Sequence, residues 1–143
     1  MPKLNTSSLS ATNKPVDEKI TINLGCVDLG QIDLLVQEGF YANRTDLIRT
    51  AIRNQLGTHA EVVRQVVRRK TLALGIQHFS QSDLLALQAA GERLHIRVLG
   101  LASIALEVSP ELALATIESI TVLGALHASP AVKTALRQRT LNA

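Results

Sequence analysis

The stretch KITINLG, Lys19–Gly25, alternates polar and apolar side chains, as an amphipathic β-strand does. Its apolar face would hold Ile20, Ile22 and Leu24. Its polar face would hold Lys19, Thr21 and Asn23. The residues that follow, up to about residue 70, show helical patterns and offer no second strand, although a lone strand leaves its backbone donors and acceptors unpaired. We therefore expect the strand to pair with its counterpart in a second copy, as an antiparallel ribbon across a two-fold axis.

Composition indicates a folded chain, because 46% of its 143 residues are hydrophobic and 19% are charged. Aromatic residues are almost absent, which disfavours a stacking platform for single-stranded bases. The single cysteine, Cys26, excludes an intrachain disulfide and a thiolate zinc site. No apolar run is long enough for a membrane span, and the first ten residues lack the apolar core of a secretion signal. We therefore expect a cytoplasmic, nucleoid-associated protein that does not contact a membrane.

The pattern divides the chain into four parts. Residues 1–17 are rich in Ser, Thr, Asn and Pro and predict a flexible arm. Residues 18–57 contain the strand, a helix that ends at Gly39, and a second helix that is capped by Asn43 and ends at Gly57. Residues 58–70 predict a basic connecting helix, and residues 71–143 predict a domain of strands and helices.

Positive charge is concentrated between residues 44 and 70. This segment holds seven basic and two acidic side chains, a local charge of +5 in a chain whose net charge is +3. Such a basic block is typical of a protein with an anionic partner. A solvated helix face is the alternative interpretation.

Residues 71–143 contain three similar segments, each with an apolar strand that ends in Leu-Gly, a capping serine and a short helix. The glycines fall at positions 75, 100 and 124, at spacings of 25 and then 24 residues. The expected helix caps are Ser82, Ser109 and Ser129. This period lies in the range of strand-and-helix solenoid repeats. The fold class is therefore expected to be α+β, with a solenoid-like C-terminal domain that pairs dimers into tetramers or longer arrays.

The predicted ribbon has the size and the chemistry to read double-stranded DNA. A two-stranded ribbon fits the major groove, where Asn pairs with adenine, Lys donates to guanine, and Thr offers a hydroxyl and a methyl group. The predicted strand is followed by a helix and then by the sequence YANRTDLIRTAIRNQL. The order and lengths of these elements resemble those of the ribbon-helix-helix family, which contains the Arc, MetJ and CopG regulators. Residues 18–57 resemble this family.

The resemblance implies roles for specific positions. Base contacts would come from Lys19, Thr21 and Asn23, and a DNA phosphate would bind at Asn43, Arg44 and Thr45. A helix N-terminus has free N–H groups and a partial positive charge, which independently supports the phosphate site. Further phosphate contacts are expected from Arg49, Arg53, Arg68, Arg69 and Lys70. The dimer core is expected to contain Ile20, Ile22, Leu24, Ile32, Leu47, Ile48 and Ile52.

Histidine is a common metal ligand, and the chain contains four histidines. His78 and His127 occupy equivalent positions in the repeat, with Ser103 between them, but no carboxylate or cysteine joins them. The sequence also contains no glycine-rich phosphate loop, nucleophile elbow or acid pair. We therefore expect no metal, no cofactor and no enzymatic activity.

The sequence leaves three functions open. The leading one is a sequence-specific double-stranded DNA-binding repressor. The alternatives are an antitoxin with a toxin partner and a weakly specific protein that organises or coats DNA. Toxin-binding tails are commonly disordered before binding, whereas residues 71–143 are predicted to be ordered.

Overall fold

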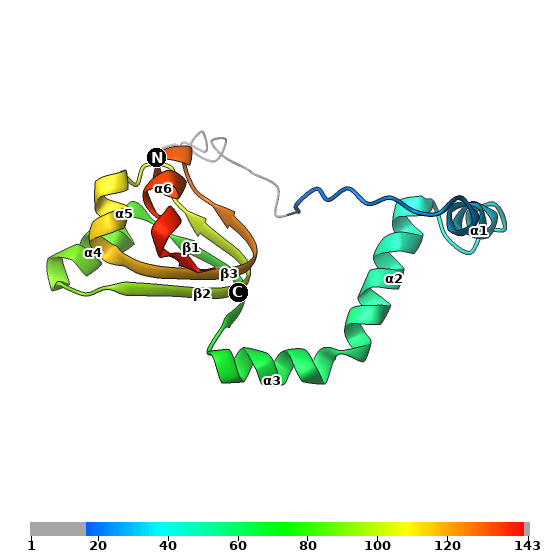
Figure 1. Ribbon diagram of the computed structural model, residues 1–143, viewed down its shortest axis with the longest axis horizontal. Helices are drawn as coiled ribbons and strands as arrows, with labels where there is room; N and C mark the ends of the chain where they lie inside the picture. Colours follow the sequence, from blue (N-terminus) through cyan, green and yellow to red (C-terminus); the bar gives the residue numbers. More distant parts are fainter. Residues whose placement is uncertain (1–16, 142–143) are drawn as a thin grey trace, which may run out of the picture.

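The computed structural model describes residues 17–141. All of the predicted flexible arm except Asp17 lies outside the described residues. Helices and strands are both present, in the expected α+β combination: three helices precede a four-stranded sheet, whose strands are connected by further helices. Figure 1 shows the sheet at one end of the chain and the first three helices extending away from it.

The N-terminal half is helical after an extended segment. Helix α1 spans Cys26–Gln37, α2 spans Arg44–Thr58 and α3 spans Ala60–Lys70. As predicted, Gly39 follows α1 with a positive φ of 83°, and Asn43 caps α2 through a hydrogen bond from the amide of Asp46. The expectation that Gly57 ends α2 is wrong, because the helix continues to Thr58.

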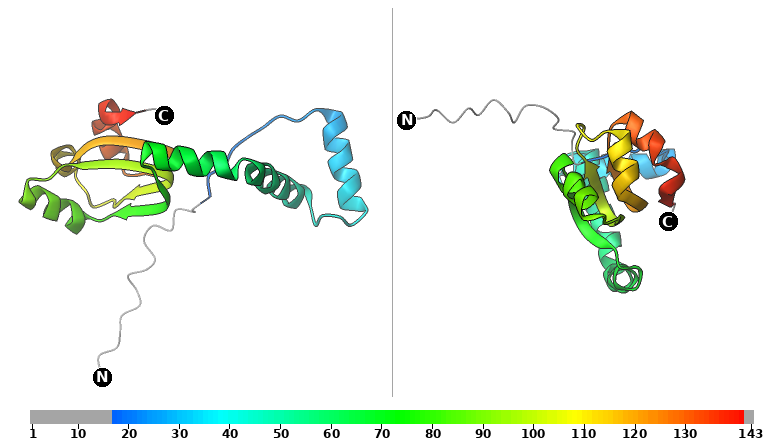
Figure 2. Two further views of the ribbon diagram at one scale, coloured as in Figure 1. Left: turned by 90° about the horizontal axis from the view of Figure 1, so that it is seen from below. Right: turned by 90° about the vertical axis from the view of Figure 1, so that its left-hand side faces the viewer.

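The C-terminal half is a parallel sheet. Its strands are β1 (Ala73–Phe79), β2 (Leu94–Ile104), β3 (Ile117–His127) and β4 (Thr140–Leu141), in the order β1-β2-β3-β4. The connections contain α4 (Gln81–Ala90), α5 (Pro110–Thr116), and α6 (Pro130–Ala135) with the 3₁₀ helix η2 (Arg137–Arg139). Crossovers of one hand between successive neighbours bring these helices to one face of the sheet (Figure 2).

The hydrophobic core lies between the sheet and these helices. Leu84 of α4, Leu112 of α5 and Val132 of α6 pack in one buried cluster with Ile96 and Ile120 of the central strands. The buried hydroxyl of Thr116 donates to the carbonyl of Leu112, so burial leaves it with a partner. The C-terminal half therefore contains a core of its own.

Three glycines are stacked across the sheet. Gly75 lies opposite Gly100, and Gly100 lies opposite Gly124, with φ values of 119°, 137° and 116°. A Cβ atom on Gly100 would collide with the carbonyl oxygen of Gly75, and one on Gly124 with that of Gly100. The prediction that each strand ends at its glycine is wrong, because the strands continue beyond this stack. A glycine resembles a strand terminator in sequence, but here its left-handed backbone is accommodated inside the strand.

The helix caps of this half agree in part with the sequence. Ser109 caps α5 and Ser129 caps α6, each through its hydroxyl and each followed by proline, as expected. The assignment of Ser82 as the cap of α4 is wrong, because Ser80 makes a reciprocal capping box with Asp83. Hydrogen bonds from the amide and the hydroxyl of Ser80 lower the pKa of the Asp83 carboxyl below its ordinary value.

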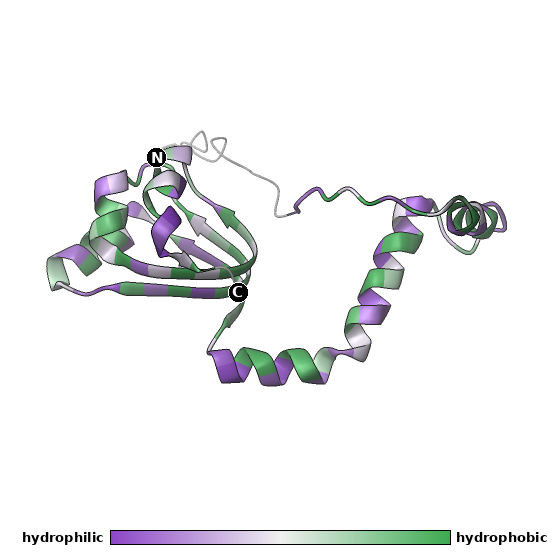
Figure 3. Ribbon diagram, in the orientation of Figure 1, coloured by the Kyte–Doolittle hydropathy of each residue, from purple (hydrophilic) through white to green (hydrophobic). Residues whose placement is uncertain are grey.

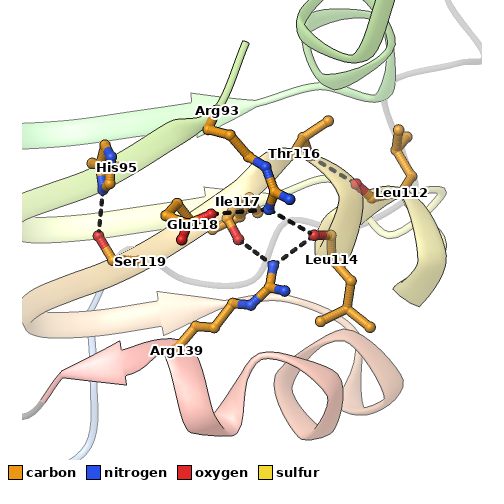
Figure 4. Close-up of polar contacts among 9 residues, drawn as sticks. All are labelled: Arg93, His95, Leu112, Leu114, Thr116, Ile117, Glu118, Ser119 and Arg139. Carbon is orange, nitrogen blue, oxygen red and sulfur yellow. Dashed lines mark hydrogen bonds and ion pairs between the residues drawn. The ribbon is translucent and has the colours of Figure 1, made fainter. Parts of the chain in front are cut away.

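Polar side chains connect neighbouring elements at one side of the core. The guanidinium of Arg139 donates to the carbonyl oxygens of Leu114 and Ile117, the latter at 2.8 Å (Figure 4). Arg93 forms an ion pair of 2.9 Å with Glu118, and His95 is hydrogen-bonded to Ser119 at 2.8 Å. These contacts hold α5, β3 and η2 together at the side of the core.

The N-terminal half has no comparable core within the described chain. Helices α1, α2 and α3 contain no buried residue, although each of them includes hydrophobic residues (Figure 3). None of the helices between residues 17 and 141 has the length and hydrophobicity that a membrane crossing requires.

Candidate nucleic-acid interface

The segment before α1 is extended but unpaired. Residues 18–25 form no strand with any other part of the described chain, and Figure 1 shows them as a long trace between the sheet and α1. Ile20, Ile22 and Leu24 are 74%, 57% and 42% exposed. The three polar positions that alternate with them are also exposed: Lys19, Thr21 and Asn23. Backbone groups and apolar side chains of this segment are therefore both available to a partner.

The N-terminus of α2 is arranged by its own side chains. The Asn43 side chain accepts a hydrogen bond of 2.8 Å from the amide of Asp46, whose carboxylate accepts one of 3.0 Å from the amide of Ala42. The first two helical amides, those of Arg44 and Thr45, find no acceptor in residues 17–141, as expected at a helix start. Asn43 therefore positions the helix end, and these two amides are open to an anion.

Arg44 already has a partner in the single chain. Its guanidinium makes a two-pronged contact with the carboxylate of Asp33 in α1, with distances of 2.7 and 2.8 Å. Hydrogen bonding to Arg44 lowers the pKa of Asp33 below its ordinary value, and the carboxylate in turn raises the pKa of Arg44. Both side chains are exposed, so the pair fixes α1 against α2 at the protein surface.

The other basic side chains fall into two groups. Arg49 and Arg53 of α2 line an open groove of about 700 Å³, which also reaches Ile20 and the sheet at Gly100. Arg68, Arg69 and Lys70 form the last turn of α3 and are exposed. Positive charge at a helix C-terminus interacts favourably with the helix dipole, so these three basic residues also stabilise α3.

The predicted dimer-core residues differ in how far they are exposed to solvent. Ile32 of α1 and Leu47 and Ile48 of α2 are half-buried where the two helices pack together. The remaining four are exposed: Ile20, Ile22, Leu24 and Ile52. The chain alone covers only part of this apolar set.

Two contacts were missed by reasoning from the sequence. Asp33 and Arg44 lie in different helices, so their spacing in the sequence does not indicate a contact, and the pair forms because α1 packs against α2. Glu18 accepts a hydrogen bond of 2.7 Å from Nε2 of His127, which lies 109 residues away. Neither contact has a signal in the sequence, since each depends on the fold.

The histidines form no metal centre in the described part of the chain. The register places His78 opposite Ser103, and Ser103 opposite His127, as the aligned repeats predict. Between residues 17 and 141, no group of three or more histidine, cysteine, aspartate or glutamate side chains converges to hold a metal ion.

Comparison with known proteins identifies the family. The model of the ribbon-helix-helix transcriptional regulator family matches residues 15–133, which include the unpaired segment, the three helices and most of the parallel sheet. No curated protein and no solved structure matches the chain. The match confirms the resemblance predicted for residues 18–57 and extends it into the C-terminal half, as far as residue 133. The chain therefore belongs to the ribbon-helix-helix family of transcriptional regulators.

Proposed function

We propose that the protein is a sequence-specific repressor that binds double-stranded DNA as a dimer, through an antiparallel ribbon made by residues 19–25 of two copies. One observation carries this proposal: the segment is extended, alternating and unpaired in the described chain, with Ile20 74% exposed. Pairing with a second copy would satisfy its backbone groups and cover its apolar face. As a DNA-binding protein without a catalytic role, it would be associated with the nucleoid.

The polar face of the ribbon is proposed to read the bases. Lys19, Thr21 and Asn23 alternate with the apolar residues, so the ribbon would present two copies of each on one side. Their donors and acceptors match base edges in the major groove. All three are exposed, which supports this role.

The start of α2 is proposed to bind a backbone phosphate. The open amides of Arg44 and Thr45 supply the hydrogen bonds, and Asn43 maintains the helix end that presents them. The guanidinium of Arg44 adds positive charge while Asp33 holds it in place. Because Asp33 neutralises part of that charge, the amides provide the directed contacts and Arg44 contributes mainly through its field.

Further basic residues are proposed to extend the contact with the DNA backbone. The exposed side chains suited to this role are Arg49, Arg53, Arg68, Arg69 and Lys70. Each phosphate contact would add to the salt dependence of binding, without adding to base preference.

We assign residues 18–57 to DNA binding, 58–70 to the connection, and 71–143 to a solenoid-like repeat domain that assembles dimers into higher oligomers. Strand β1 is at the edge of the sheet, and its side chains Leu74 and Ile76 are 71% and 61% exposed. An exposed edge with apolar side chains favours pairing with another chain. Linked dimers would occupy adjacent DNA sites through effective concentration.

The test is selection of bound duplexes from a random pool by the full-length protein. The proposal predicts enrichment of an inverted repeat, with a preference of about 10³-fold or more over random duplex at physiological salt. Binding without sequence preference would instead indicate a DNA-coating protein. Absence of binding, together with co-purification of a small basic toxin, would indicate an antitoxin.

A further inference from the structure

A second cavity lies near the carboxyl ends of the parallel strands. It has a volume of about 320 Å³. Most of its wall is apolar, and it includes Ile76, Leu101, Ile104 and Leu106. Cavities of this size, with apolar walls and a few polar groups, are typical of sites for small molecules.

The polar groups of this cavity come from three neighbouring strands. His78 of β1, Ser103 of β2 and His127 of β3 lie at or next to the last residue of their strands, and the register places them in one row. The Nδ1 atom of His78 and the hydroxyl of Ser103 are hydrogen-bonded at 3.2 Å. The row therefore offers two imidazoles and one hydroxyl beside an apolar wall.

One of these imidazoles already binds a carboxylate. Nε2 of His127 donates to the side chain of Glu18 at 2.7 Å, and the His127 side chain is only 14% exposed. An ionised carboxylate can only accept hydrogen bonds, so Nε2 of His127 is the donor. Glu18 shows which ligand group this position of the sheet accepts.

We propose that this cavity binds a small carboxylic acid with an apolar tail. Its carboxylate would take the place of Glu18 on His127 and approach His78 and Ser103, while its tail would lie against Ile76 and Leu101. A charge-assisted hydrogen bond to the carboxylate and burial of the tail would both contribute to affinity. A metal ion is a poor alternative, since two imidazoles and a hydroxyl fall short of the usual ligand set.

Binding of a ligand in this cavity would also affect the extended segment that contains Lys19. Glu18 directly precedes this residue, so a ligand on His127 would detach the start of the segment from the sheet. Ligand and Glu18 would exclude each other, and such competition is reciprocal in free energy. Only this coupling rests on the proposed DNA-binding function; the binding site itself does not.

The experiment uses the full-length protein without DNA, with its histidines labelled for NMR. Hexanoate and benzoate are titrated at fixed pH, and hexanamide and benzamide serve as uncharged controls. Either acid should shift the imidazole signals of His78 and His127 in a saturable way, whereas both amides should leave them in place. His95, which pairs with Ser119 elsewhere on the sheet, is the internal reference.

Four substitutions sharpen the test. We expect His127→Gln to weaken binding of the acids about tenfold or more, as for loss of a charge-assisted hydrogen bond, and His95→Gln to leave it unchanged. Glu18→Gln should strengthen binding because it removes the competing charge, whereas Asp17→Asn should have no effect. These two replacements are at exposed positions, so they remain informative even where His127→Gln impairs folding.

Three outcomes would overturn the proposal. The first is that neither acid shifts His78 and His127 more than His95. The second is equal binding of acids and amides, which would describe a merely apolar pocket. The third is a shift that follows protein concentration rather than acid, which would assign the cavity to contacts between copies. Because no DNA is present, none of these results depends on the DNA-binding function.

Discussion

Single side chains determine how the start of α2 is presented. Asn43 caps the helix, Asp46 closes the preceding turn, and Arg44 joins this end to Asp33 of α1. The sequence predicted the cap correctly, because a cap depends on residues close in the chain. It did not predict the Arg44 pair, which depends on how two helices pack.

The pair between Asp33 and Arg44 should be visible in a pH titration. Hydrogen bonding to Arg44 lowers the pKa of Asp33 in the folded state. The ion pair therefore stabilises the fold fully at pH values above the ordinary carboxyl pKa. That effect is lost as the pH falls through the lowered value. In Arg44→Gln, the pKa of Asp33 measured by carboxyl NMR should rise toward its ordinary range. The pKa of Asp83 should stay low, because its hydrogen bonds with Ser80 are unchanged. An unchanged Asp33 pKa would mean that the pair does not persist in solution.

Asn23 is the sharpest test of base reading. Asn23→Ala should relax preference at one position of each half-site, by about 1–3 kcal/mol of discrimination, and should leave the salt dependence nearly unchanged. Asn54→Ala removes the same side chain from an exposed position of α2 and serves as the control. Selection from random duplexes measures both variants. Unaltered selectivity in Asn23→Ala would show that the strand face does not read the bases.

At the scale of elements, the glycine stack explains why the alignment of the three segments matched the strand register although the predicted strand ends were wrong. The spacing of Gly75, Gly100 and Gly124 was enough to align the segments, and the register matches that alignment. Glycine in a strand nevertheless has two structural meanings, a stop or a close backbone approach. Only the positions of neighbouring strands distinguish them, and these positions are not encoded locally.

Gly100→Ala should therefore be severely destabilising. Its φ of 137° is unfavourable for alanine, and the new methyl group would collide with the carbonyl of Gly75. Backbone strain alone costs about 1–3 kcal/mol, and displacement of β1 adds to it. Gly30→Ala is the matched control, because Gly30 lies in helix α1 with open space around it; this change should stabilise by about 0.5–1 kcal/mol. Urea unfolding monitored by circular dichroism measures both, and equal stability of the variants would contradict the stack.

At the scale of the whole molecule, the two halves differ in how they are stabilised. The C-terminal half has its core between the sheet and α4–α6, whereas the described α1, α2 and α3 have no buried residue. The alternation in residues 19–25 predicted an apolar face on this segment, and its lack of a partner strand suggested a second copy. A half whose apolar surface remains open in the single chain should be stable only to the extent that it associates.

Ile22→Asp tests this difference directly. A charge at the centre of the proposed ribbon would have to be buried in the dimer, so the variant should sediment with about half the assembly size of the parent protein. Leu85→Asp changes an apolar residue of α4 with similar exposure, 48% against 57% for Ile22, and it should leave the assembly intact. The sheet should remain folded in both variants, because its buried residues lie between Leu72 and Leu136.

In the parent protein, unfolding of the N-terminal helices should shift to higher temperature with rising protein concentration. Ile22→Asp should abolish that shift. Sedimentation equilibrium and amide hydrogen exchange measure these effects, and an Ile22→Asp protein that associates like its parent would exclude the ribbon as the dimer contact.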